Sequence, residues 1–453
     1  MIPLHHLKGQ KIAVLGLSRT GQATAEAALA GGAAVDVWDD NPDNPTPAGA
    51  TRLNFPEEGF DGHDLLVMSP GIPLTHPQPH NAVLLAKAAS IPVVGDIELL
   101  WREKGQQHPF IGITGTNGKS TTTALLGHVI KNAQVPVAVG GNIGDAVLSL
   151  DAPPVGASFV LELSSYQLDL CRSTEFSGAA LLNITPDHLS RHGGLSGYID
   201  AKLRIFARQK AGNLALVGVD DEHGKTIAAA LGHHSRATVL PVTTARPLDI
   251  GISAYGGDLR LNGQHILDLR DVPRLAGEHN WQNAAVAAGL AWHAGLTADQ
   301  INDGIRSFPG LAHRQELVGT KNGLSFVNDS KATNAEAAAV ALRAYKNVLW
   351  LAGGQSKEGG LQAAIYDLDG VRAAFVYGES AQDFAAQLTE KSIPVQAFTT
   401  LDEAFGAALA TAEAESIDSA TILLAPAAAS WDQFTSFEHR GDTFRALAQA
   451  YLS

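Results

Sequence analysis

Short apolar runs recur along the chain and alternate with longer stretches rich in alanine and leucine. Each run ends in glycine or in polar residues, as strands of a parallel sheet do when helices cover both faces. The pattern predicts an α/β protein with strands at 11–16, 34–38, 64–69, 110–115, 158–164, 178–185, 213–220, 324–330, 347–354, 373–378 and 420–426. Ligands of such sheets bind beyond the carboxyl ends of the strands, so polar residues at those ends are the candidates for function.

Two interruptions of this pattern divide the chain into three expected domains, residues 1–100, 101–308 and 309–453. The charged stretch WREKGQQH precedes a fresh strand at 110, and Pro309 and Gly310 break a helical pattern before further strands begin. Residues 251–269 have the alternation of a small antiparallel insertion, with Asn262 and Gly263 as its hairpin turn.

Composition and charge narrow the class of protein. The 453 residues carry a net charge of −14, which argues against a protein that binds nucleic acid through a basic face. Cys171 is the single cysteine, which excludes an intramolecular disulfide and a cysteine-rich zinc site. No apolar run approaches the roughly 18 residues of a membrane span, and the N-terminus has no signal-peptide pattern. We expect a cytoplasmic monomer without nucleic-acid or membrane partners.

The strongest motif is GITGTNGKS at residues 112–120. Its spacing departs from the usual phosphate-binding loop, because Ile113 stands where that loop has its first glycine. A strand nevertheless leads into it and a helix follows, so backbone amides and the helix start can hold phosphate. The expected cradle consists of Gly115, Thr116, Asn117, Gly118, Lys119, Ser120 and Thr121. Lys119 would reach the β- and γ-phosphates and the Ser120 hydroxyl would ligate Mg²⁺; the alternative is a glycine-rich turn with a solvated lysine.

Charged residues follow the neighbouring strands. Glu162 ends the strand at 158–164, where a carboxylate near Mg²⁺ is expected, although a buried structural carboxylate remains the alternative. Asp187 and His188 follow the next strand, so His188 could ligate a metal while Asp187 orients it. Lys202 lies in a helical stretch without an acidic residue one turn away, and the pattern alone predicts a solvated helix face.

Segments from one end of the chain to the other occur in the order found in the Mur ligases of peptidoglycan synthesis, and together they resemble that family. They are VMSPGIPLTHP (67–77), VGDIEL (94–99), GITGTNGKSTTT (112–123), GGNIG (140–144), ELSSYQL (162–168), NITPDHLSRH (183–192), AKLRIF (201–206), GEHNWQN (277–283), AHRQE (312–316), NDSKATN (328–334), LAGGQSK (351–357) and LLAPAAASWDQFTSFEHRG (423–441). The resemblance implies an N-terminal Rossmann-like domain that binds a UDP-linked substrate, a central P-loop-type ATPase domain with a parallel sheet, and a C-terminal Rossmann-like domain that binds an amino acid.

The resemblance also implies a reaction. Such ligases use ATP to convert an acid into an acyl phosphate, which the amine of an amino acid then attacks, and two Mg²⁺ ions offset the negative charge. Lys119, Glu162, His188 and Lys202 match the catalytic positions. The metal ligands would be Ser120, Glu162, His188 and Lys202, the last as a carbamate, whose oxygens suit Mg²⁺ better than an ammonium does.

The remaining site residues also come from the resemblance. Asn280 and Asn283 match positions that contact adenine, Arg314 matches an arginine that reaches the phosphates, and Asp329 matches a carboxylate on the ribose side. The UDP part of the substrate would contact Ser18, Arg19, Thr20, Asp39, Ser69, Pro70, Gly71 and Asn142. D-Glutamate would contact Lys331, Thr333, Lys357, Ser430 and Phe437, while Gln355 stands where several relatives have aspartate. SKATN and AAASWDQF favour D-glutamate as the amino acid and UDP-N-acetylmuramoyl-L-alanine as its acceptor.

Three other functions remain open at the level of the sequence. The N-terminal turn 16–21, with Ser18 in place of the middle glycine of a dinucleotide loop, together with Asp39, would suit a nicotinamide oxidoreductase. A related ligase could use another acceptor or amino acid, as folylpolyglutamate synthases do. A nonenzymatic switch would bind ATP without turnover that depends on an amine.

Overall fold

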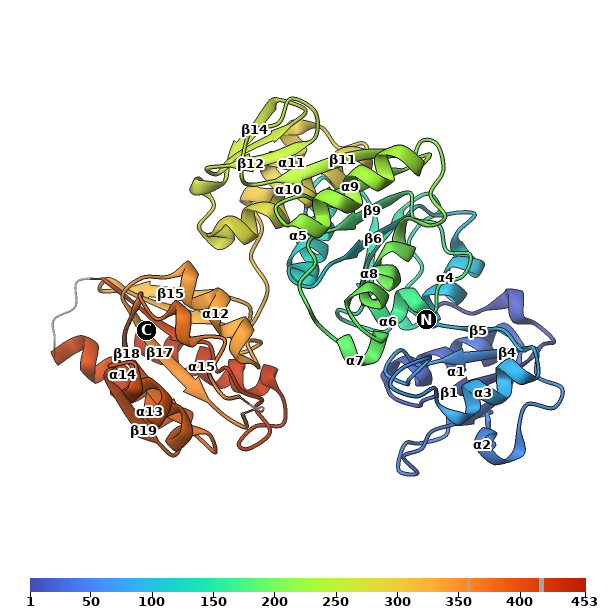
Figure 1. Cartoon of the computed structure of the whole chain (residues 1–453), viewed down its shortest axis with the longest axis horizontal. Helices are drawn as coiled ribbons and strands as arrows, with labels where there is room; N and C mark the ends of the chain where they lie inside the picture. The colour runs from blue at the N-terminus through green and yellow to red at the C-terminus, as the bar shows by residue number, and fades with distance from the viewer. Residues whose placement is uncertain (357–358, 415–418) are drawn as a thin grey trace. The chain divides into compact units, whose positions relative to one another are not determined.

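A computed structural model describes residues 1–356, 359–414 and 419–453. The chain is an α/β protein with three sheets that are mostly parallel, as the sequence predicts (Figure 1). It divides into two compact units, residues 1–308 with two of the sheets and residues 309–453 with the third. Each unit is described by itself.

The first sheet has five parallel strands in the order β3-β2-β1-β4-β5. Alternate residues of β1 enter two different cores: Ile12 and Val14 pack with α1, and Ala13 and Leu15 pack with α3. Helices therefore cover both faces, which explains the continuous apolar strands. The elements are β1 Lys11–Leu15, α1 Arg19–Gly31, β2 Ala34–Trp38, β3 Thr51–Arg52, α2 Phe55–Glu58, β4 Leu65–Met68, α3 Asn81–Ala88, β5 Val93–Val94 and α4 Asp96–Lys104.

The second sheet has nine strands in the order β14-β13-β12-β11-β10-β9-β6-β8-β7. The strands from β7 to β12 are parallel, and β13 is antiparallel to its two neighbours, β12 and β14. The predicted hairpin at Asn262 and Gly263 is confirmed, and both residues have positive φ, as the tight hairpin turn requires. The strands are β6 Phe110–Thr114, β7 Val137–Gly141, β8 Ser158–Glu162, β9 Gly178–Leu181, β10 Leu214–Gly218, β11 Thr238–Thr243, β12 Ile252–Tyr255, β13 Asp258–Leu261 and β14 Gln264–Asp268.

Side chains cap the starts of three helices of this second part, α6, α9 and α11. Ser164 and Gln167 form a capping box at the start of α6, and Thr297 and Gln300 form another at α11. The helices are α5 Lys119–Asn132, α6 Ser165–Asp169, α7 Leu189–His192, α8 Leu195–Leu203, α9 Glu222–His234, α10 Glu278–His293 and α11 Ala298–Arg306. Short 3-10 helices in the whole chain are η1 His5–Leu7, η2 Val147–Ser149, η3 Arg204–Phe206, η4 Leu269–Asp271, η5 Pro273–Leu275 and η6 Ile365–Asp367.

The second unit contains a six-stranded sheet in the order β15-β16-β20-β17-β18-β19, in which only β15 is antiparallel to its neighbour. Val348 and Trp350 of β17 face one core, and Leu349 and Leu351 face the other, so helices again cover both faces. The elements are β15 Glu316–Lys321, β16 Leu324–Asn328, α12 Ala335–Ala344, β17 Val348–Gly353, β18 Val371–Tyr377, α13 Ala381–Glu390, β19 Val395–Phe398, α14 Leu401–Ala414, β20 Ala420–Leu424 and α15 Phe437–Leu452.

Helix α4 joins the first two sheets through Glu98. Its carboxylate accepts hydrogen bonds from the backbone amides of Arg172, Ser173 and Thr174. Burial opposes its charge, but these bonds and those from the Ser173 and Thr174 hydroxyls outweigh burial and lower the pKa of Glu98 to about 2. Residue 100, where the first expected domain ends, lies inside this helix.

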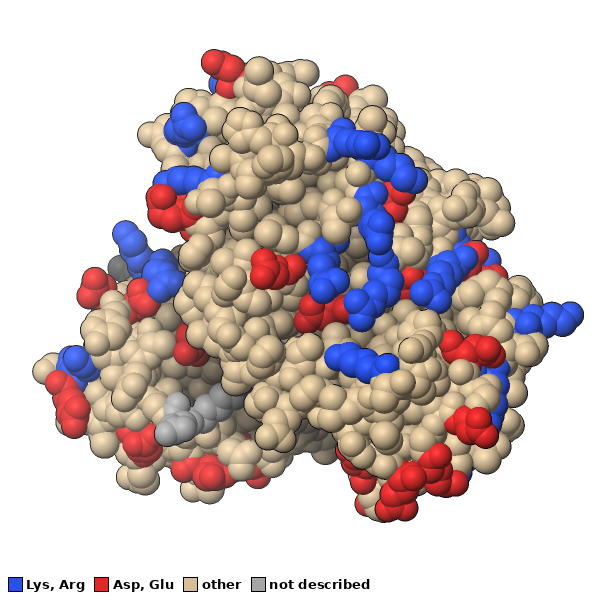
Figure 2. Space-filling view, turned by 45° about the vertical axis from the view of Figure 1, so that its right-hand side comes forward, with Lys and Arg blue, Asp and Glu red and all other residues tan. Residues whose placement is uncertain are grey.

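Two further properties concern the apolar character of the helices and the charge of the surface. Among the helices that the structure describes, none combines the length and the apolar character that crossing a bilayer requires. On the face drawn in Figure 2, Lys and Arg side chains stand next to Asp and Glu side chains, so both signs of charge are mixed there.

Candidate active site

Residues 115–118, called the glycine loop below, connect strand β6 to helix α5. Gly115 has a φ of 155° and Gly118, the N-cap of α5, has a φ of 86°. A Cβ added to Gly118 would lie 2.3 Å from the side-chain oxygen of Asn283, so the close packing there requires glycine. Lys119 and Ser120 open α5, where the backbone amides of the first turn point away from the helix and favour an anion.

The segment 183–185, which follows β9, holds the glycine loop in place. The amide of Asn117 donates to Asn183 Oδ1 at 2.9 Å, and the amide of Thr116 donates to the Asn183 carbonyl at 3.1 Å. The Thr185 amide donates to Thr116 Oγ1 at 3.0 Å. The loop therefore has a fixed backbone without a ligand, which lowers the entropic cost of binding phosphate.

The ammonium group of Lys119 folds back over the loop. Its Nζ donates to the carbonyl oxygens of Gly115 and Thr116 at 2.9 and 2.8 Å. An anion bound at the start of α5 would offer this ammonium a charged acceptor, which forms a stronger hydrogen bond than a carbonyl does.

Lys202 is buried, with 1% of its surface exposed, so the solvated helix face predicted from the pattern alone is wrong. Its Nζ donates to the Gly115 carbonyl at 2.8 Å and lies 4.6 Å from the centre of the Tyr198 ring. Burial lowers the pKa of Lys202 to about 7, the charge of Lys119 adds to this, and Asp187 opposes it. A large fraction of this amine is therefore unprotonated at neutral pH.

Glu162 ends strand β8 at the same edge of the sheet. The side chain is buried, and Oε1 accepts a hydrogen bond from Asn142 Nδ2 at 3.0 Å. Its Oε2 has no hydrogen-bond partner among the described residues. An uncompensated buried carboxylate oxygen is costly, so this atom fits a cation ligand.

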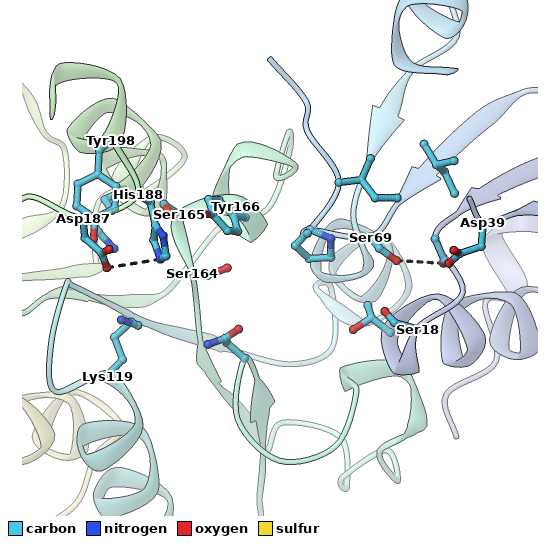
Figure 3. A pocket seen from close by; sticks show the side chains of 18 of the residues that line it. Ser18, Asp39, Ser69, Lys119, Ser164, Ser165, Tyr166, Asp187, His188 and Tyr198 are labelled. Atoms are coloured by element: carbon cyan, nitrogen blue, oxygen red, sulfur yellow. Dashed lines mark hydrogen bonds and ion pairs between the residues drawn. The ribbon is translucent and has the colours of Figure 1, made fainter. Parts of the chain in front are cut away.

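His188 precedes helix α7 in the left-handed backbone conformation, with a φ of 51°. Its Nε2 lies 3.5 Å from Asp187 Oδ2, as the contact in Figure 3 shows. Burial lowers the pKa of His188, Asp187 opposes this, and the charges of Lys119 and Lys202 lower it further. The imidazole is therefore neutral at neutral pH, the form in which histidine binds metals.

Lys119, His188 and Lys202 line one cavity of about 490 Å³ in the first unit. Figure 3 shows Lys119, His188 and Tyr198 on one side of it, and Ser18, Asp39 and Ser69 on the other. The predicted site residues that line it are Ser18, Thr20, Asp39, Ser69, Pro70, Gly71, Lys119, Asn142, His188 and Lys202. Arg19, Ser120 and Glu162 are not among its described lining residues.

The N-terminal turn 16–21 is held by residues predicted for the UDP side. Asp39, beyond the end of β2, accepts hydrogen bonds from the amides of Leu17 and Asn41. Burial works against its ionisation, but these bonds outweigh burial and lower the pKa of Asp39. Ser69 Oγ donates to the Gly16 carbonyl at 3.1 Å, so the loop after β4 is joined to the same turn.

Asn280 and Asn283 lie on one face of α10, as predicted from their spacing. Asn283 is buried and donates from Nδ2 to Asn280 Oδ1 at 3.3 Å. Its Oδ1 accepts a hydrogen bond from the Thr122 hydroxyl of α5 at 3.1 Å. The second asparagine therefore packs against α5 beside the glycine loop, and it lies 161 residues after Thr122 in sequence.

No group of three or more His, Cys, Asp and Glu side chains in the described part of the chain is arranged to hold a metal ion. This is compatible with Mg²⁺, which proteins bind through one or two carboxylates together with water and substrate phosphates.

In the second unit, Arg314 lies between His313 and Gln315, which have positive φ values of 60° and 46°. The Gln315 amide donates to Asp329 Oδ1 at 3.3 Å. Burial raises the pKa of Asp329 to about 7, and the Gln315 amide and the charge of Arg314 oppose the rise. The segment with Arg314 is thus fixed against the end of β16.

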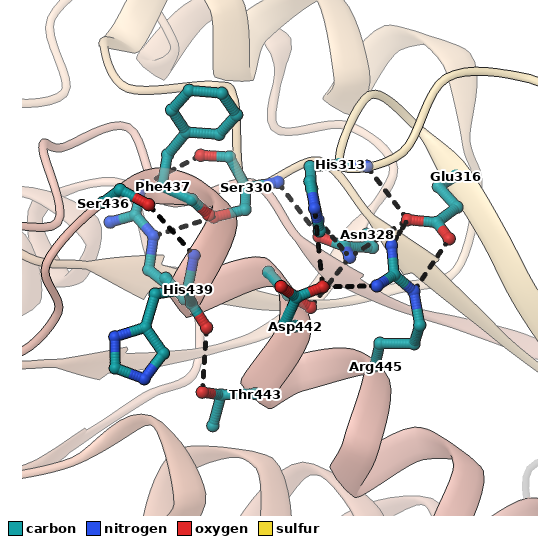
Figure 4. Close-up of polar contacts among 12 residues, drawn as sticks. His313, Glu316, Asn328, Ser330, Ser436, Phe437, His439, Asp442, Thr443 and Arg445 are labelled. Carbon is teal, nitrogen blue, oxygen red and sulfur yellow. Dashed lines mark hydrogen bonds and ion pairs between the residues drawn. The ribbon is translucent and has the colours of Figure 1, made fainter.

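A polar cluster supports this segment (Figure 4). Glu316 Oε2 accepts hydrogen bonds from the His313 amide at 2.9 Å and from Asn328 Nδ2 at 3.2 Å. Arg445 donates to both oxygens of Glu316, at 3.0 and 2.9 Å. The strained backbone at His313 is therefore compensated by a network of charged hydrogen bonds.

Two of the residues predicted for the amino acid, Lys331 and Phe437, meet at the start of α15. Lys331 Nζ lies 4.0 Å from the centre of the Phe437 ring, and the Ser330 hydroxyl donates to the Phe437 carbonyl at 2.8 Å. Arg440, fully buried, donates to the carbonyls of Gly353, Ala428 and Ser330.

The other residues predicted for this site are less informative. Ser430 is buried, and Thr333 donates its amide to the Lys331 carbonyl at 2.8 Å. The amide of Gln355 bonds to the Ala429 carbonyl at 2.8 Å, and its Nε2 lies 3.4 Å from Glu379 Oε2. Lys357 lies outside the described residues.

Comparison with known proteins identifies the family. Residues 113–291 match the Mur ligase middle domain, and residues 313–428 match the Mur ligase glutamate ligase domain. UDP-N-acetylmuramoylalanine–D-glutamate ligase of Paramagnetospirillum magneticum is 47% identical, over 100% of this chain and 99% of that protein. The chain belongs to the Mur ligase family. The Caulobacter sp. protein with the same name is 45% identical to this Mur ligase, over 98% of this chain and 97% of that protein.

Solved structures of Mur ligases have the same fold. MurF from Acinetobacter baumannii gives a TM-score of 0.60 at 19% identity, over 98% of this chain and 92% of that one. UDP-N-acetylmuramate-alanine ligase MurC from Thermotoga maritima gives a TM-score of 0.58 at 17% identity, over 97% of this chain and 99% of that one. The predicted family and fold class are confirmed.

The cavity of this Mur ligase also has polar lining residues that the sequence analysis did not assign to the site. They are Asp40, Ser164, Ser165, Tyr166 and Tyr198. The polar segment SSYQ directly after β8 was a signal for three of them, because it stands at the carboxyl end of a central strand. Tyr198 had no such signal, since it lies within α8 and reaches the glycine loop only in the folded chain, with its hydroxyl 3.1 Å from Thr116 Oγ1.

Proposed function

We propose that this Mur ligase uses ATP to join D-glutamate to UDP-N-acetylmuramoyl-L-alanine, as a cytoplasmic step of peptidoglycan precursor synthesis. The names of the most similar full-length relatives support the choice of substrates. The observation that carries the proposal is the single cavity shared by the N-terminal turn, Lys119 of the phosphate cradle and Lys202. One ligand can extend from the UDP side to the reacting phosphate there.

ATP would bind with its phosphates at the glycine loop and the start of α5. Lys119 would transfer its hydrogen bonds from two loop carbonyls to phosphate oxygens. Thr121 follows Ser120 in the first turn of α5, and Asn280 and Asn283 would contact adenine. Arg314 and Asp329 would add contacts to the phosphates and the ribose.

The oxygen and nitrogen donors of this site suit two Mg²⁺ ions. Ser120 and the unpartnered oxygen of Glu162 would hold one ion, and the neutral imidazole of His188 together with a carbamylated Lys202 would hold the other. Bound Mg²⁺ would neutralise phosphate charge during transfer.

Lys202 is suited to carbamylation because its amine is buried and only partly protonated. The lone pair of Nζ would attack the carbon of CO₂, a new N–C bond would form, and one proton would pass to solvent. The product is an anion with two oxygen ligands in place of a cation, which also removes the repulsion between Lys202 and Lys119.

The bond changes would follow two steps. A carboxylate oxygen of the acceptor attacks the γ-phosphorus of ATP, the bond to ADP breaks, and an acyl phosphate forms. The unprotonated amine of D-glutamate then attacks the acyl carbon, the C–N bond forms, the C–O bond to phosphate breaks, and the nitrogen releases one proton to solvent. Lys119 and the first amides of α5 would hold the transferring phosphoryl group, while Lys331, Thr333, Lys357, Ser430 and Phe437 would hold D-glutamate.

Phosphate release from ATP tests the proposal. We expect release only when UDP-N-acetylmuramoyl-L-alanine, D-glutamate and Mg²⁺ are all present, and formation of the amide product in equal amount. Equally efficient phosphate release with L-glutamate or L-lysine would show that the enzyme is not specific for D-glutamate. Release that needs no amino acid would reject the ligase.

A further inference from the structure

A hydroxyl, an imidazole and a carboxylate lie in line at the wall of the cavity, on residues that the proposed function does not use. Ser165 Oγ lies 2.9 Å from His192 Nε2, and His192 Nδ1 lies 3.4 Å from Asp169 Oδ2. Ser165 lines the cavity (Figure 3), whereas His192 lies behind it with 7% of its surface exposed.

The surroundings fix the orientation of all three side chains. Ser165 begins α6 directly after the N-cap Ser164, and Asp169 ends the same helix and pairs with Arg204 Nε at 3.3 Å. The His192 ring contacts the rings of Tyr166 and Tyr198, with ring centres 5.5 and 5.6 Å away. A ring with two aromatic neighbours and a polar partner at each nitrogen cannot turn freely.

This arrangement determines the direction of the hydrogen bonds. A carboxylate beside Nδ1 favours the imidazole proton on that nitrogen, which leaves the lone pair on Nε2. The hydroxyl of Ser165 then donates its single proton to Nε2. Towards the cavity, Ser165 Oγ can only accept, so its partner in a bound substrate must be an N–H or O–H group.

The position of Ser165 selects among the donors of the substrate. It stands three residues after Glu162, and the Tyr198 ring, which packs on His192, also contacts the ammonium of Lys202. Ser165 therefore lies at the reacting end of the cavity. The donor nearest to the reacting carboxylate of UDP-N-acetylmuramoyl-L-alanine is the N–H of its L-alanyl amide.

On the basis of the proposed function, we infer that Ser165 Oγ accepts a hydrogen bond from the L-alanyl amide of the acceptor substrate. His192 and Asp169 are positioning residues that hold the serine hydroxyl in its accepting orientation. The contact would direct the alanyl carboxylate towards the γ-phosphate and would favour an amide over an otherwise similar ester.

The test compares two substrates. One is UDP-N-acetylmuramoyl-L-alanine, and the other is its analogue with L-lactate in place of L-alanine, in which an ester oxygen replaces the N–H. We expect Ser165→Ala to lower kcat/KM for the amide about 5- to 10-fold, the value of one hydrogen bond. For the wild type, kcat/KM with the ester should be lower than with the amide by at least the same factor. Ser165→Ala should not lower kcat/KM for the ester any further. An equal loss with both substrates overturns the inference.

Variants at position 192 test the positioning role. His192→Phe keeps a ring between the two tyrosines but removes both nitrogens, and we expect it to lower the amide-to-ester ratio of kcat/KM as Ser165→Ala does. The double variant should be no worse than Ser165→Ala alone, because the two residues act as a unit. His192→Gln, which retains an acceptor, should recover part of the ratio. Additive losses with an unchanged ratio overturn the positioning role.

The chain provides a matched control. Ser307 Oγ lies 3.0 Å from His128 Nε2, a second serine–histidine hydrogen bond outside the cavity. Ser307→Ala should leave the amide-to-ester ratio unchanged, and an equal shift there would overturn the inference. A wild type that is inactive with the amide substrate would reject the proposed function itself, whereas an active wild type with no ratio change rejects only the contact at Ser165.

Discussion

The amine of Lys202 donates a hydrogen bond to the carbonyl of Gly115, with 2.8 Å between the two atoms. The two residues are 87 positions apart, and the contact places a buried, partly unprotonated lysine against the loop that we assign to phosphate. This relationship links the two halves of the proposed chemistry, the phosphate cradle and the second metal site.

Lys202→Ala should reduce ligase activity by about 100-fold or more, because it removes both proposed oxygen ligands from the metal site. Added formate or acetate should restore part of the rate, since a small carboxylate can occupy the space of the carbamate. Phosphate release at increasing acetate concentration measures this. Lys210→Ala, at an exposed lysine paired with Glu175, is the control and should neither lose activity nor respond to acetate. A near-normal rate for Lys202→Ala would contradict the assignment.

Gly118→Ala should abolish measurable ATP binding, because its Cβ would lie 2.3 Å from Asn283 Oδ1 and would displace the start of α5. Gly9→Ala is the matched control: Gly9 also has a positive φ, 78°, but a Cβ there meets no atom within 4 Å. Each variant carries about 1–2 kcal/mol of backbone strain, so a difference between them reports on the packing. Calorimetric titration with ATP and a melting curve of each variant check this. Equal ATP affinities would show that the loop does not bind the nucleotide.

Lys331→Met should raise the KM for D-glutamate about 10- to 100-fold, the value of a lost charge-assisted hydrogen bond, with little effect on the KM for the UDP-linked substrate. Lys321→Met serves as control, because Lys321 also stands over an aromatic ring, that of Tyr451 at 5.4 Å, but is not predicted to contact substrate. Steady-state kinetics with each substrate varied in turn measure the two effects. A similar KM change in both variants would indicate a general effect of losing a lysine from this unit.

Asp96→Asn should stabilise the protein above pH 6. Burial raises the pKa of Asp96 from 3.8 to about 6, so the folded chain holds a proton that the unfolded chain releases between these values. The cost of the buried charge is therefore absent below about pH 4, grows up to pH 6 and then stays at about 3 kcal/mol. Urea unfolding at pH 4 and pH 7.5 should show the gain only at the higher pH. Asp299→Asn, at an exposed aspartate in the first turn of α11, should show no such gain.

Local patterns predicted most of the fold. The apolar strands β1, β2, β6 and β8 begin where the sequence places them, since burial on both faces leaves a continuous apolar run. The hairpin at Asn262 could also be predicted directly from the sequence, because the residues that form its turn are neighbours in the chain. The position of this hairpin in the fold could not be predicted from local sequence. Strand β12 pairs with β11, so the expected insertion extends the edge of the second sheet.

The site was harder to predict, because its electrostatics depend on contacts between distant residues. Arg204 pairs with Asp169 of another helix, 35 residues earlier. Lys202 looked solvated for the same reason, and only the resemblance to a family gave it a role. The line from Ser165 through His192 to Asp169 carries no motif at all, since it forms where the ends of α6 and α7 meet.

The guanidinium of Arg440 leads to a last consequence for the second unit. It donates to carbonyls at or beyond the ends of three different strands, β16, β17 and β20, and its Nε donates to the Ser330 hydroxyl at 3.0 Å. Lysine at this position could replace the charge but could not reach all these acceptors from one nitrogen. Three separate backbone segments thus depend on the shape of a single planar group, so position 440 requires that shape more than the charge it carries.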